Sequence, residues 1–152
     1  MWMYPFIRPP LDIDLRRIEA FVDVAVRRDN EFHVLAGTAA NCWVARGMLE
    51  KTQELLQNAG EKFVKVNDDF DEKSLSEHAP GTLFFFSELR NQNESAYSAE
   101  VVEKCLDAGG TVFAVVHGGS LEGVIRRLHN LGMPQTLIER KLKVEDFIRE
   151  LR

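Results

Sequence analysis

Short continuous apolar runs alternate along this chain with longer segments of mixed character. The runs are rich in aromatic and β-branched residues, which is typical of strands buried on both faces of a parallel sheet. They predict strands at residues 32–36, 62–66, 82–86 and 112–116. In the longer segments apolar residues recur at helical spacing. This pattern predicts helices at residues 14–28, 41–57, 95–107 and 120–131.

Two further segments carry weaker patterns. Residues 73–79 predict a weak helix or a loop, and residues 135–151 predict a last helix with a break near Lys143 and Val144. The predicted helix at residues 41–57 carries five candidate core residues: Trp43, Met48, Leu49, Leu55 and Leu56. We therefore expect strands and helices to alternate from the first strand to the end of the chain.

Such alternation predicts an α/β fold with a mostly parallel sheet and helices on both faces. The length of 152 residues indicates one domain, which we place at residues 13–152. Residues 1–12 form an aromatic and proline-rich N-terminal arm, predicted to be extended as far as Pro10. The aromatic residues of this arm either pack on a neighbouring surface or cover the core of this domain: Trp2, Tyr4 and Phe6.

Composition excludes several classes of protein. A net charge of −5 and a pI of about 5.4 argue against a nucleic-acid-binding surface. The two cysteines, Cys42 and Cys105, have no metal-like spacing, and they favour a reduced cytosolic compartment. No apolar run approaches the ~20 residues that span a bilayer, so work at a membrane would require docking through partners.

Polar residues follow two of the predicted strands. Glu88 and Arg90 come after the strand at residues 82–86, and His117 comes after the strand at residues 112–116. The carboxyl ends of parallel strands line the ligand crevice of an open α/β sheet. We therefore expect these three side chains at one edge of the sheet.

The same stretch resembles the secretion and twitching-motility ATPases of type II secretion and type IV pili. In that family a Walker B strand ends in Gly-Glu-x-Arg-Asp, and a later strand leads to a Leu-His-Thr histidine box and a helix with an arginine. This chain has Ser87-Glu88-Leu89-Arg90-Asn91, then Val116-His117-Gly118, then Arg127. The resemblance covers residues 10–138 and implies a RecA-like, P-loop-type domain.

The resemblance also assigns roles to residues. Glu88 would polarise the attacking water or hold Mg²⁺ through water, and it is catalytic only if the protein is active. Because Arg126 lies next to Arg127, the sequence leaves open which of the two occupies the family position. The simplest alternative role for Glu88 is an ion pair with Arg90. The positions that correspond to nucleotide-binding residues are read as vestigial: Gly37, Thr38, Asp68, Arg90, His117 and Arg127.

The phosphate loop of this family is degenerate here. The pattern G-x-x-x-x-G-K-[ST] places backbone N–H groups, a lysine and a hydroxyl around the phosphates. Counted from Gly37, the second glycine, the lysine and the hydroxyl fall on Cys42, Trp43 and Val44. Arg46 is the nearest cation, and its position one helical turn further on predicts that it points elsewhere. Thr38 is then a candidate helix cap.

These losses favour a non-catalytic, pseudo-ATPase component of a type IV pilus, type II secretion or conjugation-like system that acts through protein contacts. The alternative is a weak or partner-completed ATPase. No metal and no cofactor are expected, and ATP with Mg²⁺ would bind only under the alternative. The chain is either a reduced relative or a piece of a larger protein.

The expected partners are secretion or pilus apparatus proteins, among them an intact paralogous ATPase, with a homo-oligomer left open. Neither nucleic-acid binding nor direct membrane insertion is expected. The expected location is the cytoplasm, with peripheral attachment to the inner membrane through partners left open.

Overall fold

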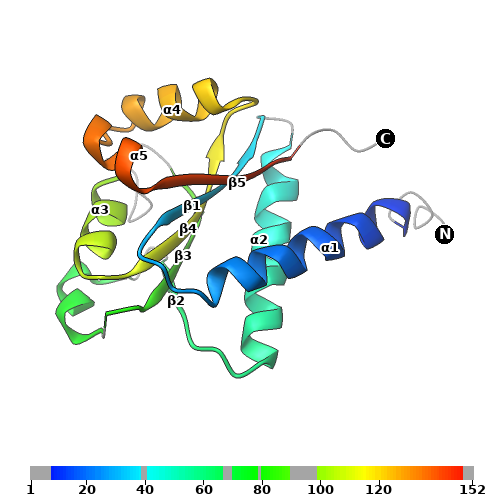
Figure 1. Cartoon of the computed structure of the whole chain (residues 1–152), viewed down its shortest axis with the longest axis horizontal. Helices are drawn as coiled ribbons and strands as arrows, with labels where there is room; N and C mark the ends of the chain where they lie inside the picture. The colour runs from blue at the N-terminus through cyan, green and yellow to red at the C-terminus, as the bar shows by residue number, and fades with distance from the viewer. Residues whose placement is uncertain (1–7, 39–40, 67–69, 79, 90–98, 149–152) are drawn as a thin grey trace.

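The computed structural model describes residues 8–38, 41–66, 70–78, 80–89 and 99–148, with only the backbone described for residues 8–14 and Glu72. Helices and strands alternate along the described chain, except that two helices precede the last strand (Figure 1). The elements are α1 (Arg8–Ala25), β1 (Phe32–Gly37), α2 (Cys42–Asn58), β2 (Val64–Val66), η2 (Glu72–Glu77), β3 (Leu83–Glu88), α3 (Ala99–Asp107), β4 (Thr111–His117), α4 (Leu121–Asn130), α5 (Gln135–Lys141) and β5 (Leu142–Ile148).

The five strands form one sheet in the order β2-β3-β4-β1-β5. Every neighbouring pair is parallel, so the predicted parallel arrangement of the first four strands is confirmed. The central strands β1 and β4 are buried along almost their whole length. This burial explains why their sequences are continuous apolar runs rather than alternating ones.

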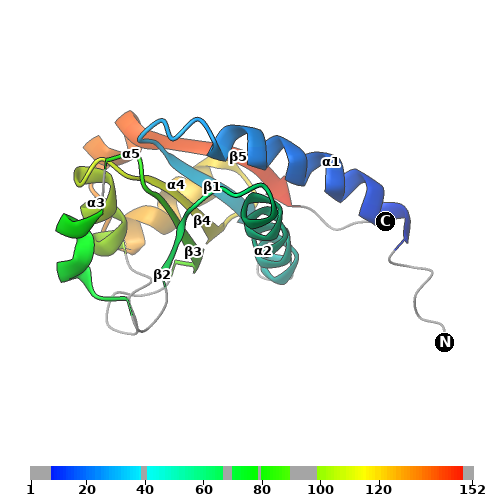
Figure 2. The ribbon, with the colours of Figure 1, turned by 90° about the horizontal axis from the view of Figure 1, so that it is seen from below.

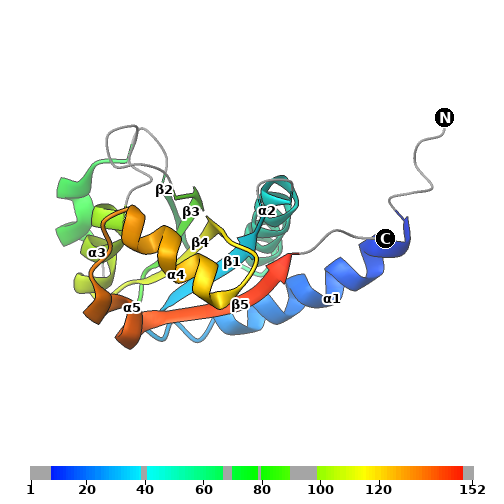
Figure 3. The same ribbon diagram turned by 90° about the horizontal axis from the view of Figure 1, so that it is seen from above.

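Helices cover both faces of the sheet, as predicted (Figures 2 and 3). On one face α1 and α2 enclose a core that includes Phe21, Leu49, Phe85 and Phe113. On the other face α3, α4 and α5 enclose a second core around Phe84 and the neighbouring strands. The result is a three-layer α/β domain in which all strand ends of one polarity meet at one edge. None of the described helices is long and apolar enough to cross a membrane.

The predicted N-terminal arm is partly wrong. α1 begins at Arg8, so residues 8–10 are helical rather than extended, and the proposed boundary between residues 12 and 13 falls inside this helix. Pro9 and Pro10 are tolerated because the first turn of a helix has no intrahelical acceptors for its N–H groups. The aromatic residues Trp2, Tyr4 and Phe6 lie outside the described residues.

The predicted last helix is partly wrong: it begins at Gln135 as predicted, but it is much shorter. It ends at Lys141, and residues 142–148 form the edge strand β5. The register pairs Val34 with Val144 but Leu35 with Asp146, so Glu145 is an extra residue on β5. Such a bulge interrupts the period-two alternation by which a half-buried strand is recognised.

Smaller differences concern element bounds and one core residue. β2 begins at Val64 rather than residue 62, and residues 72–77 form a short 3₁₀ helix where a weak helix or loop was predicted. Trp43 is 67% exposed, which contradicts its assignment to the core. Met48, Leu49 and Leu56 are buried as predicted.

Candidate functional site

The carboxyl-terminal edge of the sheet brings together three chain segments. Gly37 at the end of β1 pairs with His117 at the end of β4, and the Gly118 N–H donates a hydrogen bond to the Gly37 carbonyl at 2.9 Å. β3 ends beside them at Glu88, and α2 begins with Cys42. The predicted meeting of Glu88 and His117 at this edge is therefore confirmed.

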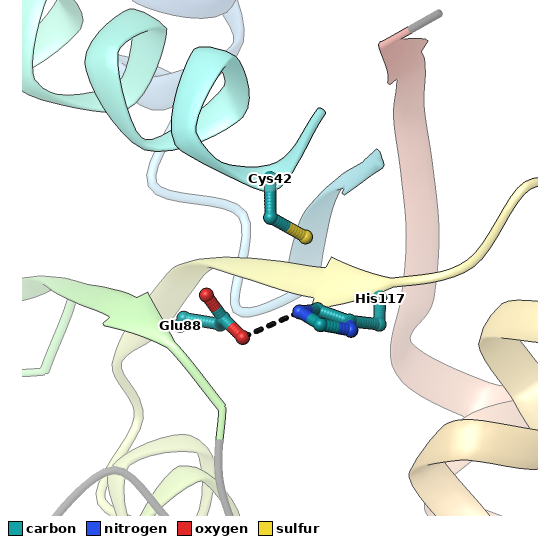
Figure 4. A group of neighbouring side chains, drawn as sticks. All are labelled: Cys42, Glu88 and His117. Carbon is teal, nitrogen blue, oxygen red and sulfur yellow. Dashed lines mark ion pairs between the residues drawn. The ribbon is translucent and has the colours of Figure 1, made fainter. Parts of the chain in front are cut away.

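Glu88 and His117 are in direct contact. His117 Nε2 lies 2.6 Å from Glu88 Oε2, and the Glu88 side chain is 15% exposed (Figure 4). An irregularity in β3 places the carboxylate there: between Phe85 and Glu88 the strand advances one residue more than β4 does opposite it. An extra residue of this kind re-aims a side chain at a strand end.

Arg46 also reaches this site, contrary to the prediction that it points elsewhere. Its Nε lies 3.9 Å from Glu88 Oε1, one helical turn into α2. The predicted alternative partner of Glu88, Arg90, lies outside the described residues, as does Asp68. The described partners of the Glu88 carboxylate are therefore one imidazole and one guanidinium group.

Cys42 completes the group. Its Sγ–H donates to the Gly37 carbonyl at 3.2 Å, and the residue is buried. Burial, and then the nearby charge of Glu88, raise the pKa of Cys42 to about 11, although the charges of Arg46 and Arg127 act in the opposite direction. A thiol with so high a pKa is a poor nucleophile near neutral pH.

Potential ligand atoms of Cys42, Glu88 and His117 lie within 4.8 Å of one another. Sequence reasoning did not predict this group, which we call the Cys42–Glu88–His117 cluster. From the sequence, Cys42 stood only at the position of the second glycine of the phosphate loop. The available signal was the strand-to-helix turn after Gly37, which brings the first residue of α2 to the same edge as Glu88 and His117.

The turn that corresponds to the phosphate loop is closely packed at its start. A Cβ atom on Gly37 would lie 3.3 Å from the carbonyl carbon and oxygen of Asn41. The N-cap of α2 is Asn41, so the assignment of Thr38 as the helix cap is wrong. Thr38 Oγ1 instead accepts a hydrogen bond from Asn41 Nδ2 at 3.1 Å.

The structure distinguishes the two neighbouring arginines of α4. Arg126 extends into solvent and pairs with Glu122 Oε1 at 3.2 Å. Arg127 is partly buried and close enough to influence the Cys42 thiol. Among the described residues its buried Nε has no hydrogen-bond partner. Of the two, Arg127 is therefore the arginine whose charge reaches the Cys42 thiol.

The arrangement offers an acid–base pair, a buried thiol and two nearby guanidinium groups at the sheet edge where α/β proteins commonly bind ligands. Comparisons with models of protein families, with curated proteins and with solved structures find no match to this chain.

Proposed function

We propose that this chain is a non-catalytic, RecA-like component of a type IV pilus, type II secretion or conjugation-like apparatus, and that it acts through protein contacts. The observation that carries the proposal is the engagement of Glu88. Its carboxylate is occupied by His117 at 2.6 Å and approached by Arg46 at 3.9 Å. A carboxylate held in this way is not free to orient a water molecule for attack on a phosphate.

Two further features support the proposal. The all-parallel sheet is consistent with a RecA-like fold, Glu88 and His117 are in contact at the edge where its strands end, and the charge of Arg127 acts on the neighbouring Cys42. The residue in the lysine position of the phosphate loop, Trp43, is neutral and 67% exposed. A site without that lysine loses charge stabilisation of the phosphates, a large part of catalysis by this class of enzyme.

A weak or partner-completed ATPase remains the second candidate, and one observation favours it. Arg46 and Arg127 both lie near enough to Cys42 to affect the pKa of its thiol. Guanidinium groups bind phosphates well, so these two could replace part of the missing cation. This candidate would place the protein at the same apparatus, attached to the inner membrane through partners.

Calorimetry of ATP binding to the purified chain, with and without Mg²⁺, separates the two candidates. We expect no saturable heat of binding and an ATP hydrolysis rate no higher than that of Glu88→Gln. The substitution keeps the size of the side chain and removes its charge. A hydrolysis rate that Glu88→Gln abolishes would instead establish the enzyme.

A further inference from the structure

The geometry points to a binding site for a transition-metal ion of the Zn²⁺ class, with Cys42 Sγ, the Glu88 carboxylate and the His117 imidazole as ligands. This inference goes beyond the proposed function and does not rest on it, because a metal could bind whether or not the domain binds nucleotide. Among the described residues, this is the one group of three potential ligands close enough together to hold a metal ion.

The ligand atoms lie close to the separations of a tetrahedral site, and small rotations would bring them to it. Zn²⁺ binds Cys, His and carboxylate ligands at about 2.0–2.3 Å, so neighbouring ligand atoms in a tetrahedral site lie about 3.3–3.6 Å apart. In the cluster the ligand atoms lie within 4.8 Å of one another, and the His117 and Glu88 atoms that pair are 2.6 Å apart. Small side-chain rotations that draw Sγ inward and separate the imidazole from the carboxylate would create the site.

The three ligands come from three rigid elements. Cys42 opens α2, while Glu88 and His117 end two adjacent strands, and all three side chains converge on one point (Figure 4). Positions on strands and helices hold ligands more accurately than positions on loops. His117 is 36% exposed in its side chain, so an ion can enter from solvent on that side.

The chemistry of the ligands selects the ion. A thiolate and an imidazole favour Zn²⁺ and related transition metals, whereas Mg²⁺ requires oxygen ligands and octahedral geometry. The charges also balance, because a divalent cation with one thiolate and one carboxylate forms a neutral unit. The neighbouring cation Arg46 therefore does not prevent binding.

Binding exchanges protons for metal bonds. The Cys42 S–H bond breaks, its proton passes to solvent, and the sulfur donates an electron pair to the ion. The ligating nitrogen of His117 must carry no proton, so the hydrogen bond between His117 and Glu88 is replaced by one bond from each residue to the metal. Because protons are released, the affinity should rise with pH. Three protein ligands leave a fourth position open, as in zinc sites that bind water or a substrate.

Cobalt tests the site, because thiolate ligation of Co²⁺ produces a charge-transfer absorption band that other ligands do not. The full chain, reduced and stripped of metal, is titrated with Co²⁺ and then with Zn²⁺. We expect one equivalent of Co²⁺ to produce the band and Zn²⁺ to displace it. Zn²⁺ should also raise the melting temperature, since it binds only the folded site, whereas Mg²⁺ should leave it unchanged.

Three variants identify the ligands. Cys42→Ser keeps the hydrogen-bond donor to Gly37 and should abolish the band. His117→Asn alters a partly exposed side chain and should lower Zn²⁺ affinity more than the about 10–100-fold that loss of a residue orienting a ligand typically costs. The matched control is Cys105→Ala, in the core on the other side of the sheet, and it should keep the band.

The proposal is overturned if the wild type gives no band, if folded Cys42→Ser keeps the band, or if Cys105→Ala abolishes it. It is also overturned if His117→Asn binds Zn²⁺ as tightly as the wild type. If Cys42→Ser does not fold, the His117→Asn affinity still decides the outcome. No nucleotide enters these measurements, so a negative result leaves the test of ATP binding unaffected.

Discussion

His33, the one ionisable residue of β1, is buried between two carboxylates. Its Nδ1 lies 2.6 Å from Glu145 Oε2 and its Nε2 lies 2.9 Å from Asp29 Oδ1. Burial lowers the pKa of His33, but the hydrogen bonds and the negative charges of Glu145 and Asp29 together outweigh it, so the pKa lies above its ordinary value. A protonated imidazole donates from both nitrogens and satisfies both partners.

This arrangement predicts a pH dependence of stability. A raised pKa means that the folded protein holds the proton more tightly than the unfolded chain does. The stability contributed by His33 is therefore fully present below its unfolded pKa of about 6.5 and is lost as the pH rises through the higher folded pKa. We expect the melting temperature of the wild type to fall over that window and the fall to be smaller in His33→Gln.

The control is His129→Gln, an exposed histidine in the last turn of α4. It should reproduce the pH profile of the wild type. A profile unchanged by His33→Gln would show that His33 is neutral in the folded protein.

Asn30 connects the loop before β1 to two other parts of the chain. Its φ of 61° is left-handed, a conformation that asparagine adopts more readily than most residues. Its Nδ2 donates to the carbonyls of Leu106 and Gly110 at 3.0 and 2.7 Å, and its Oδ1 accepts from Lys141 Nζ at 2.7 Å. One side chain thus anchors the loop, the end of α3 and the end of α5.

We expect Asn30→Ala to lower the free energy of unfolding by about 2 kcal/mol, because three partly buried partners lose a hydrogen bond and a fully buried one left unsatisfied costs about 1–3 kcal/mol. Urea denaturation measures the change. The exposed Asn130→Ala, on α4, should stay within about 0.5 kcal/mol of the wild type. Equal losses in both variants would contradict the anchoring role.

At the scale of elements, continuous apolar runs were sufficient to predict β1, β3 and β4 and their parallel order. The sequence did not reveal β5, because the bulge at Glu145 breaks its alternation and an edge strand has only one strand neighbour to enforce burial. The site shows the same limit. Placing Glu88 and His117 at one edge required only strand polarity, whereas the contact between them depends on an extra residue in β3 that no local pattern indicates.

The turn from β4 to α4 depends on close backbone packing at Gly118. A Cβ atom there would lie 2.7 Å from Val124 Cγ2 and 2.9 Å from the Val124 nitrogen. Because Val124 is buried and its nitrogen belongs to the backbone, the helix start would have to shift. We expect Gly118→Ala to lower the free energy of unfolding by about 1–3 kcal/mol, the usual cost of overpacking.

The comparison for this variant is Gly47→Ala, in the middle of α2, where a Cβ atom would meet nothing within 4 Å. Alanine should stabilise this exposed helical position by roughly 0.5–1 kcal/mol. Denaturation curves of the two variants should therefore move in opposite directions. Stabilisation by both variants would show that the turn accommodates a Cβ atom at Gly118 without cost.

For the whole molecule, the two edges of the sheet differ in character. At the edge where the strands start, hydrogen bonds connect loops that are far apart in the sequence, such as those from Arg28 to the carbonyls of Gly81 and Lys62. The edge at the strand ends carries the Cys42–Glu88–His117 cluster and the exposed Trp43. Near it lies Arg127, whose buried Nε has no hydrogen-bond partner within the described part of the chain. Exposed tryptophan and arginine are the residues most enriched among those that dominate protein interfaces.

We therefore expect Trp43→Ala and Arg127→Ala to weaken self-association or capture of cognate secretion or pilus apparatus proteins. Loss of an interface tryptophan costs at least about 2 kcal/mol where it is a hot spot. Removal of one partner from a desolvated charge pair costs about 2–5 kcal/mol. Either loss lowers affinity by at least about 30-fold. Sedimentation velocity and pull-down measure binding, and thermal melting confirms that the variants are folded.

The control is Val26→Ala. Val26 is 43% exposed and lies just after α1, in the loop that leads to the start of β1. It lies toward the opposite edge of the sheet, so binding should not change. The docking surface is misplaced if Trp43→Ala and Arg127→Ala bind as the wild type does while Val26→Ala does not. If the wild type is a monomer that captures none of these proteins, the proposed role in such an apparatus fails as well, because a domain without catalysis can contribute there only through its contacts.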